Sequence, residues 1–463
     1  MIEPEVASRV LRAALGGGGD FAEVFAEDRR GSQAVLDDRR VEELASGAER
    51  GAGIRVVVGD TTGYAHTADL SEAGLLRAAE AAAAVARQAG GRTRTVALSS
   101  GTRGTRAEGI TDPASVAKAA KVELLRRADD AARAAGGAIA QVSTSYSDSR
   151  RRVLVANSDG LLATDDQVRT RLMVNCVASG DAGMQTGYES VAHTVGFELF
   201  DRVEVEQVAR VAAERALVKL GARPAPSGVV PVVIKGGSGG ILFHEACGHG
   251  LEADHIQKNS SVYVDKTDEL VASPLVTLVD DGTMGEQWGT SAVDDEGHPC
   301  ASTVLIEDGV LTDYMWDFLR ARKQGRPAPA NGRRQSYQHL PMVRMTNTFL
   351  RPGTETPEEL IAQTPYGVYV AKLGGGQVNT VTGDFVFGMT EAYLIENGHV
   401  TSPLRDANLI GNGPAVLRQI DAVASDFAMM PGTCGKDGQQ VPVGCGQPTV
   451  RITGVTVGGT AGG

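Results

Sequence analysis

One stretch of the sequence constrains the fold most, because it contains the candidate site residues: Phe243-His244-Glu245-Ala246-Cys247-Gly248-His249-Gly250. It places two imidazoles and a carboxylate close together, directly after the glycine-rich run 235–240. Two histidines beside a glutamate are typical of a catalytic zinc site, in which the imidazoles hold the metal and the glutamate takes a proton from metal-bound water. The familiar zinc-protease spacing is H-E-x-x-H, whereas this chain reads H-E-x-x-x-H.

The extra residue between the histidines has a geometric consequence. Residues five apart on a straight α-helix diverge by about 140° around its axis, compared with about 40° for residues four apart. The His244 and His249 rings therefore reach one metal only if the helix widens into a π-bulge or ends between them. Gly248 and Gly250 make such a departure easiest beside His249. The alternative is two unrelated histidines on a partly buried helix.

The overall composition indicates a globular protein and excludes one class of partner. A chain of 463 residues is expected to form two domains. Its 58 glycines fall largely between strand-like segments, where they predict turns. The net charge of −12, without a clustered basic face, argues against nucleic acid as the main partner.

The sequence also indicates a compartment. Met1-Ile2-Glu3-Pro4 begins an acidic amphipathic helix rather than a secretory signal. No apolar run is long enough to span a bilayer. The five cysteines are an odd and sparse set, which argues against a disulfide framework. We therefore expect a cytoplasmic protein that does not cross a membrane and has at least one free thiol.

Residues 1–222 predict an N-terminal α/β domain in which a helix–strands–helix pattern occurs twice. In the first unit, helices are expected over Pro4–Leu15 and over the alanine-rich segment 69–89. Strand-like segments lie between them, the clearest being 53–58. The pattern repeats without visible sequence identity.

Two helix starts are predicted in the second unit. Asp112 is expected to cap a helix whose first position is Pro113 and which runs to the glycines at 136–137. Asp201 with Glu204 three residues later has the spacing of a capping box. We therefore expect the last helix of this domain to begin at Asp201.

The second half predicts a different architecture. Segment 221–228, rich in proline and small residues, is interpreted as a linker. Residues 229–463 are expected to form a strand-rich domain that carries the metal-site helix. Asp308-Gly309 and Asn397-Gly398 predict two-residue hairpin turns. The predicted fold class is therefore α+β with two domains, 1–222 and 229–463.

A catalytic zinc commonly has three protein ligands and one open position. Cys434 is a good third candidate, because glycine and threonine flank it and Lys436 nearby would favour its thiolate form. Cys445 is a weaker candidate. Cys247, between the histidines, is better interpreted as a small buried residue.

Three charged or titratable residues follow the motif. Glu252 is interpreted either as a partner that orients a ligating imidazole or as a solvated charge. His255 is left without a role. Asp254 is expected at the surface.

A second polar cluster lies at 331–339, where Arg334 and His339 are candidate substrate-binding residues. Arginine and histidine in a glycine-containing loop are suited to bind a peptide carbonyl or terminal carboxylate. A structural loop with surface arginines is the alternative.

The chain resembles the TldD/PmbA metallopeptidase family over nearly its whole length, through motifs that are specific. The matching segments are 20–24, 51–58, 244–252, 294–297, 331–334, 345–348, 409–414 and 433–439.

The resemblance implies a two-domain zinc peptidase. It implies that His244, His249 and Cys434 hold the zinc and that Glu245 is the general base. It also implies small or unfolded peptides as substrates. Family members pair with a TldE/PmbA subunit that lacks the motif, so this chain is expected to be the active subunit of a heterodimer or to form a homodimer.

Two other functions are compatible with the same residues. One is a peptide-binding or chaperone-like subunit whose metal is structural. The other is a hydrolase that matures one peptide natural product. Removing the metal distinguishes the peptide-binding subunit from a peptidase. A structural metal supports the fold, so its loss would unfold the protein.

Overall fold

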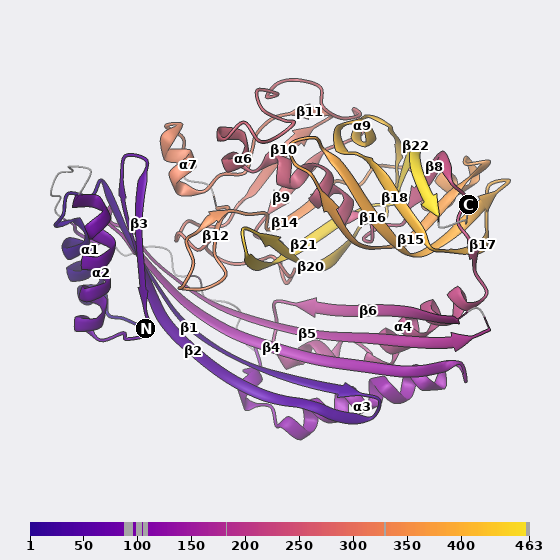
Figure 1. Ribbon diagram of the computed structural model, residues 1–463, viewed down its shortest axis with the longest axis horizontal. Coiled ribbons are helices and arrows are strands. Elements are labelled where there is room, and N and C mark those ends of the chain that lie inside the picture. Colours follow the sequence, from indigo (N-terminus) through magenta and orange to yellow (C-terminus); the bar gives the residue numbers. More distant parts are fainter. Residues whose placement is uncertain (88–95, 99–103, 105–109, 182, 328–329, 460–463) are drawn as a thin grey trace.

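The computed structural model describes residues 1–463 apart from 88–95, 99–103, 105–109, 182, 328–329 and 460–463. A long, curved N-terminal sheet lies along one side of the molecule, and a strand-rich C-terminal half packs over it (Figure 1). Among the described residues, no helix has the length and apolar character needed to cross a membrane.

The N-terminal sheet is antiparallel, in the order β3-β2-β1-β4-β5-β6. Its strands are β1 (Phe21–Asp37), β2 (Arg40–Val58), β3 (Thr61–Thr67), β4 (Ile139–Asn157), β5 (Leu162–Gly180) and β6 (Gly183–His193). Its helices are α1 (Pro4–Leu15), α2 (Glu72–Arg87), α3 (Lys118–Ala134) and α4 (Val205–Leu220). Each unit is thus a helix, three strands and a helix, as predicted, and β1 and β4 join the two units.

The helices bury apolar residues against the two ends of this sheet. Val10 and Leu11 of α1 pack with Val24 and Ile54 of the sheet. Alanines of α3 and α4 pack with Val174 and its neighbours at the other end. Figure 1 shows α1 and α2 beside one end and α3 and α4 beneath the other, so the face opposite α3 and α4 is left for the C-terminal half.

Both predicted helix starts in the second unit are wrong. The Asp112 carboxylate does accept a hydrogen bond from the Ala114 amide, at 2.9 Å, but it caps only a 3₁₀ turn, Pro113–Ser115. Val116 is extended, and α3 starts at Lys118. Likewise Asp201 ends a 3₁₀ turn, and α4 starts at Val205. In each case the chain changes direction before the helix. Helix Pro4–Leu15 of the first unit is confirmed. The helix predicted over 69–89 is present but starts at Glu72, and residues 88–89 lie outside the described part of the chain.

The C-terminal half contains two larger sheets. The first has the order β15-β8-β22-β18-β16-β17-β7, and an additional β15–β16 pairing closes a ring of strands. Its strands are β7 (Arg223–Pro224), β8 (Gly228–Ile234), β15 (Tyr366–Val378), β16 (Asp384–Glu396), β17 (His399–Arg405), β18 (Ala407–Asn412) and β22 (Val450–Gly459), with β19 (Ile420–Val423) paired to β22.

The second sheet has the order β11-β10-β9-β14-β21-β20 and carries the predicted thiols. Its strands are β9 (Leu278–Asp281), β10 (Ser302–Glu307), β11 (Val310–Leu311), β14 (Asn347–Leu350), β20 (Ala428–Lys436) and β21 (Gln439–Gln447). A small pair, β12 (Gly332–Arg333) and β13 (Met342–Val343), lies beside it, and short helices α7 (Phe318–Lys323), α8 (Pro357–Ala362) and α9 (Gly413–Arg418) connect the strands.

Both predicted hairpin turns are confirmed. Asp308 and Gly309 have φ of 47° and 85°, and Asn397 and Gly398 have φ of 53° and 76°. Positive φ at both central residues matches the twist of the flanking strands, which is why Asp-Gly and Asn-Gly occur there. The turns therefore set the registers of β10 with β11 and of β16 with β17.

Buried ion pairs join the C-terminal half to the N-terminal sheet. The Arg55 guanidinium lies 2.7 Å from both Glu23 and Glu296, and all three side chains are almost fully buried. Arg334 pairs with Glu23 at 2.5 Å. Since removal of one partner would leave a buried charge uncompensated, these pairs hold the two halves in one relative position.

Candidate metal centre

The motif lies on a helix that changes type along its length. After β8 the chain forms α5 (Gly240–Phe243), then a π turn over His244–Gly248 and a 3₁₀ turn over His249–Leu251. The His249 amide donates to the His244 carbonyl, five residues back, which is the π hydrogen bond. This is one of the two departures from α geometry that the histidine spacing predicted.

Glycines let this helix lie close to its neighbours. A side chain at position 240 would overlap the backbone of Cys445 on β21, and one at 248 would overlap Met345. Gly248 itself has ordinary helical angles, with φ of −53°. The sequence predicts that Gly248 eases a change of backbone conformation, whereas in the structure it allows the helix to pack closely against the end of the Met345 side chain.

The structure brings the three predicted ligands together. Ligand atoms of His244, His249 and Cys434 all lie within 4.8 Å of one another, and all three residues are buried. Cys434 Sγ is 3.4 Å from His249 Nε2. Zn–S and Zn–N bonds of about 2.3 and 2.0 Å in a tetrahedron separate the ligand atoms by about 3.3 to 3.5 Å. The donor set and its spacing therefore suit Zn²⁺.

A further observation supports this fit. His244 Nδ1 is buried and has no hydrogen-bond partner in the described part of the chain. The two imidazole rings are nearly perpendicular, at 85°, with centroids 5.0 Å apart. Buried polar atoms are rarely left unpaired, so this histidine is suited to an additional partner such as a metal ion.

The charges of the three side chains are coupled. Burial alone would raise the pKa of the Cys434 thiol, but the adjacent His244 and His249 lower this pKa to about 4. Burial alone would lower the pKa of His249, but Glu252 and Cys434 raise it to about 10. The thiolate is thus the stable form of Cys434, and it is also the form that binds metal. Zinc binding would displace the imidazole protons.

Glu252 is a buried partner of His249 rather than a solvated charge. Its Oε2 lies 3.0 Å from His249 Nδ1 and accepts from Lys436 Nζ at 2.9 Å. Burial raises the pKa of this carboxyl, but His249 and Lys436 together lower it to about 2. The carboxylate therefore orients the imidazole so that Nε2 faces Cys434.

Lys436 and Asp254 complete this buried network. Lys436 donates to Asp254 Oδ1 at 2.7 Å, and Asp254 is only 4% exposed. The expectation that Asp254 lies at the surface is wrong, because the ammonium ion of Lys436 holds it inside. Half-buried His255 lies beside the same network, with Nε2 3.8 Å from Glu252.

We expect Glu252→Gln to weaken zinc binding by about 10- to 100-fold, because loss of a carboxylate partner of a ligating histidine has effects of this size. The measurement is competition against a chromophoric chelator. Glu269→Gln is the matched control, since among the described residues the Glu269 side chain pairs with exposed Lys266 and lies away from the ligands. Equal affinities of both variants and the unaltered chain would contradict the role given to Glu252.

Glu245 lies beside the three ligand residues. Its side chain is 18% exposed, and its Oε2 is 4.0 Å from His249 Nε2. The carboxylate therefore reaches both the ligand cluster and solvent. This is the position that a general base acting on water requires.

The other predicted residues lie in varied environments. Cys247 is fully buried and donates to the Phe243 carbonyl, at 3.0 Å, as expected for a small buried residue. Burial lowers the pKa of His244, but Cys445 on β21 is close enough to help raise it.

Arg334 is buried in its pair with Glu23, and His339 Nδ1 lies 2.9 Å from Ser336 Oγ. A substrate-binding role for Arg334 and His339 stays a prediction.

The chain was compared with protein families. Three family models match successive segments: PmbA/TldA metallopeptidase domain 1 over residues 22–86, the central domain over 111–220 and the C-terminal domain over 227–459.

Individual relatives match over most of their length. The "Metalloprotease TldD homolog" of Haemophilus influenzae is 40% identical over 449 residues, which cover 95% of this chain and 93% of that protein. A "Metalloprotease" of Methanothermobacter thermautotrophicus is 36% identical, over 95% and 96% of the two chains. The crystal structure of TldE from Thermococcus kodakarensis has the same fold, with a TM-score of 0.78 at 20% identity over 98% and 100% of the chains.

Proposed function

The chain belongs to the PmbA/TldD metallopeptidase family, and from this premise we propose that it is a zinc-dependent peptidase. The observation that carries the proposal is the meeting of His244, His249 and Cys434, with Glu245 4.0 Å from a ligand nitrogen. His244, His249 and Cys434 would hold Zn²⁺.

Each residue of the proposed site has a different role in peptide hydrolysis. Bound zinc would supply a Lewis acid able to polarise a peptide carbonyl and to make water more acidic. The Glu245 carboxylate accepts a proton from the attacking water and passes it to the leaving amine nitrogen. Glu252 keeps the His249 imidazole in place. The Cys434 thiolate lowers the charge of the centre and makes the metal a softer Lewis acid than a third histidine would.

The substrates, location and assembly belong to the same proposal. We propose that the substrates of this chain are small or unfolded peptides and that it acts in the cytoplasm. All five cysteines are free thiols, which agrees with a reducing compartment. The active assembly is a dimer, either of two copies or with a TldE/PmbA-like subunit. The chain would divide into domains 1–222 and 229–463.

Metal removal tests this proposal. We expect the purified chain, alone or with a TldE-like subunit, to contain zinc and to cleave unstructured peptides. A chelator should abolish cleavage while circular dichroism stays unchanged, and added Zn²⁺ should restore cleavage. Unfolding upon chelation would instead favour a peptide-binding subunit with a structural metal. Cleavage of only one gene-encoded peptide would favour the maturation hydrolase.

A further inference from the structure

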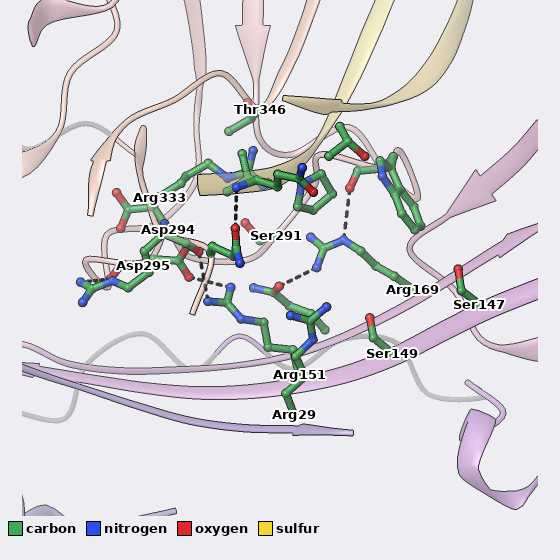
Figure 2. A pocket seen from close by; sticks show the side chains of 18 of the residues that line it. Arg29, Ser147, Ser149, Arg151, Arg169, Ser291, Asp294, Asp295, Arg333 and Thr346 are labelled. Atoms are coloured by element: carbon green, nitrogen blue, oxygen red, sulfur yellow. Dashed lines mark hydrogen bonds and ion pairs between the residues drawn. The ribbon is translucent and has the colours of Figure 1, made fainter. Parts of the chain in front are cut away.

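A second site lies between the N-terminal sheet and the β20–β21 hairpin, where a cavity of about 320 Å³ opens. Side chains from β1, β4 and β5 form its floor (Figure 2), and residues 433 and 440–442 of the β20–β21 hairpin also line it. Cys434 and Lys436 are buried toward the metal centre, whereas Thr433, which precedes Cys434 on β20, is exposed and lines the cavity. Since successive side chains of a strand point to opposite faces, the cavity and the metal centre lie on opposite sides of β20.

The cavity wall is rich in positive charge. It contains five arginines; three of them have the partners given next, and Arg333 donates to one backbone carbonyl. Arg151 pairs with Glu27 and Asp295, Arg334 pairs with Glu23, and Arg169 donates to two backbone carbonyls. The five are Arg29, Arg151, Arg169, Arg333 and Arg334.

The carboxylates that line the cavity already have hydrogen-bond or ion-pair partners. Asp148 pairs with Lys121 at 2.7 Å. Asp295 pairs with Arg151 at 2.8 Å. Asp294 accepts from backbone amides, including that of Gly332 at 3.1 Å. None of these carboxylates forms an ion pair with the two remaining arginines within the part of the chain that the structure describes.

Arg333 is a buried cation that forms no ion pair with any carboxylate of the described residues. It is 6% exposed, and its guanidinium donates to the Met345 carbonyl at 2.6 Å. Asp295 and Asp280 attract it without forming an ion pair, while nearby Arg344 repels it. Burial of a charge that forms no ion pair is unfavourable, so an anion that entered the cavity would stabilise Arg333.

Arg29 supplies a second cation from the floor of the cavity. Its side chain extends from β1 into the cavity, and it has no ion pair or hydrogen bond to any residue that the structure describes. Ser149 of β4 lies beside it, with a hydroxyl that likewise has no partner among those residues (Figure 2). The walls thus contribute one exposed and one buried guanidinium, both with donors to spare.

We propose that this cavity binds a small oxyanion, a carboxylate or a phosphate group, between Arg29 and Arg333. Guanidinium groups recognise both by paired N–H donors. Because Arg29 belongs to the N-terminal sheet and Arg333 to the C-terminal half, the anion would link the two halves and raise the thermal stability of the whole chain. The site is separate from the metal centre, so it does not depend on the proposed peptidase activity.

Two probes identify the anion. The first is inorganic phosphate. The second is acetyl-trialanine with a free C-terminal carboxylate, compared with its C-terminal amide. Each is titrated into the full chain by calorimetry and by thermal denaturation, against sodium chloride of equal ionic strength. A rise in Tm with phosphate alone identifies a phosphate group, and a rise with the free acid but not the amide identifies a carboxylate. No rise with either probe would overturn the proposal.

Variants assign the binding to these arginines. Arg29→Gln should weaken binding of the active probe by about tenfold, because one charge-assisted interaction is lost from an exposed position. Arg333→Met should abolish the rise in Tm. Arg30→Gln is the matched control, since Arg30 is the exposed neighbour on the same strand and pairs with Asp28 at 3.5 Å. Equal affinities of Arg29→Gln and Arg30→Gln would also overturn the proposal, even if Arg333→Met were poorly folded.

Discussion

Replacing Glu245 with Gln is expected to lower kcat for peptide hydrolysis by about 10²- to 10⁴-fold, the usual contribution of a general base. Glutamine has nearly the same shape but cannot accept a proton. Glu245 is not a proposed ligand, and its one ion-pair contact among the described residues is the 4.0 Å approach to His249. Zinc content and Tm should therefore stay close to those of the unaltered chain. Steady-state kinetics on an unstructured peptide and elemental analysis provide the two measurements.

The Glu269→Gln variant is again the appropriate comparison. Its exposed carboxylate pairs with Lys266 and touches neither the ligands nor Glu245. Full activity of Glu245→Gln would remove Glu245 from the role of base. Loss of zinc from that variant would instead show that the carboxylate supports the metal site.

Cys434→Ser is expected to lower zinc affinity by more than about a hundredfold, since changing even an outer partner of a ligand has effects of about 10- to 100-fold. A serine hydroxyl remains protonated where the Cys434 thiol, with its pKa of about 4, is a thiolate. The variant therefore loses a negative charge as well as a soft sulfur ligand. Elemental analysis and chelator competition measure the loss, and hydrolysis should fall with it.

Cys247→Ser provides the control for a thiol inside the motif. Cys247 donates a hydrogen bond to the Phe243 carbonyl, and a serine hydroxyl can make the same bond. We expect this variant to keep its zinc. If Cys434→Ser also kept a full complement of zinc, the assignment of Cys434 as a ligand would be refuted.

The predictions that succeeded from sequence rest on local chemistry. Helix Pro4–Leu15 has the same limits in the structure, and the two Asn/Asp-Gly turns have the positive φ that their residues favour. The π turn over His244–Gly248 follows from the spacing of two histidines that share a target. The errors at Asp112 and Asp201 arose because Asp112 starts, and Asp201 ends, a short 3₁₀ turn, and neither residue starts the long helix that follows.

The sequence by itself determined the motif, the deformation of its helix and the repeated helix–strands–helix pattern, because these depend on residues a few positions apart. Only the tertiary structure decided which groups meet. Cys434 reaches His249 across 185 positions because β20 packs beside the motif helix, and Lys436 buries Glu252 and Asp254 by the same packing. Arg29 and Arg333 face one cavity because two sheets meet there. Burial and distance set the charges of all these groups, and neither is encoded in local spacing.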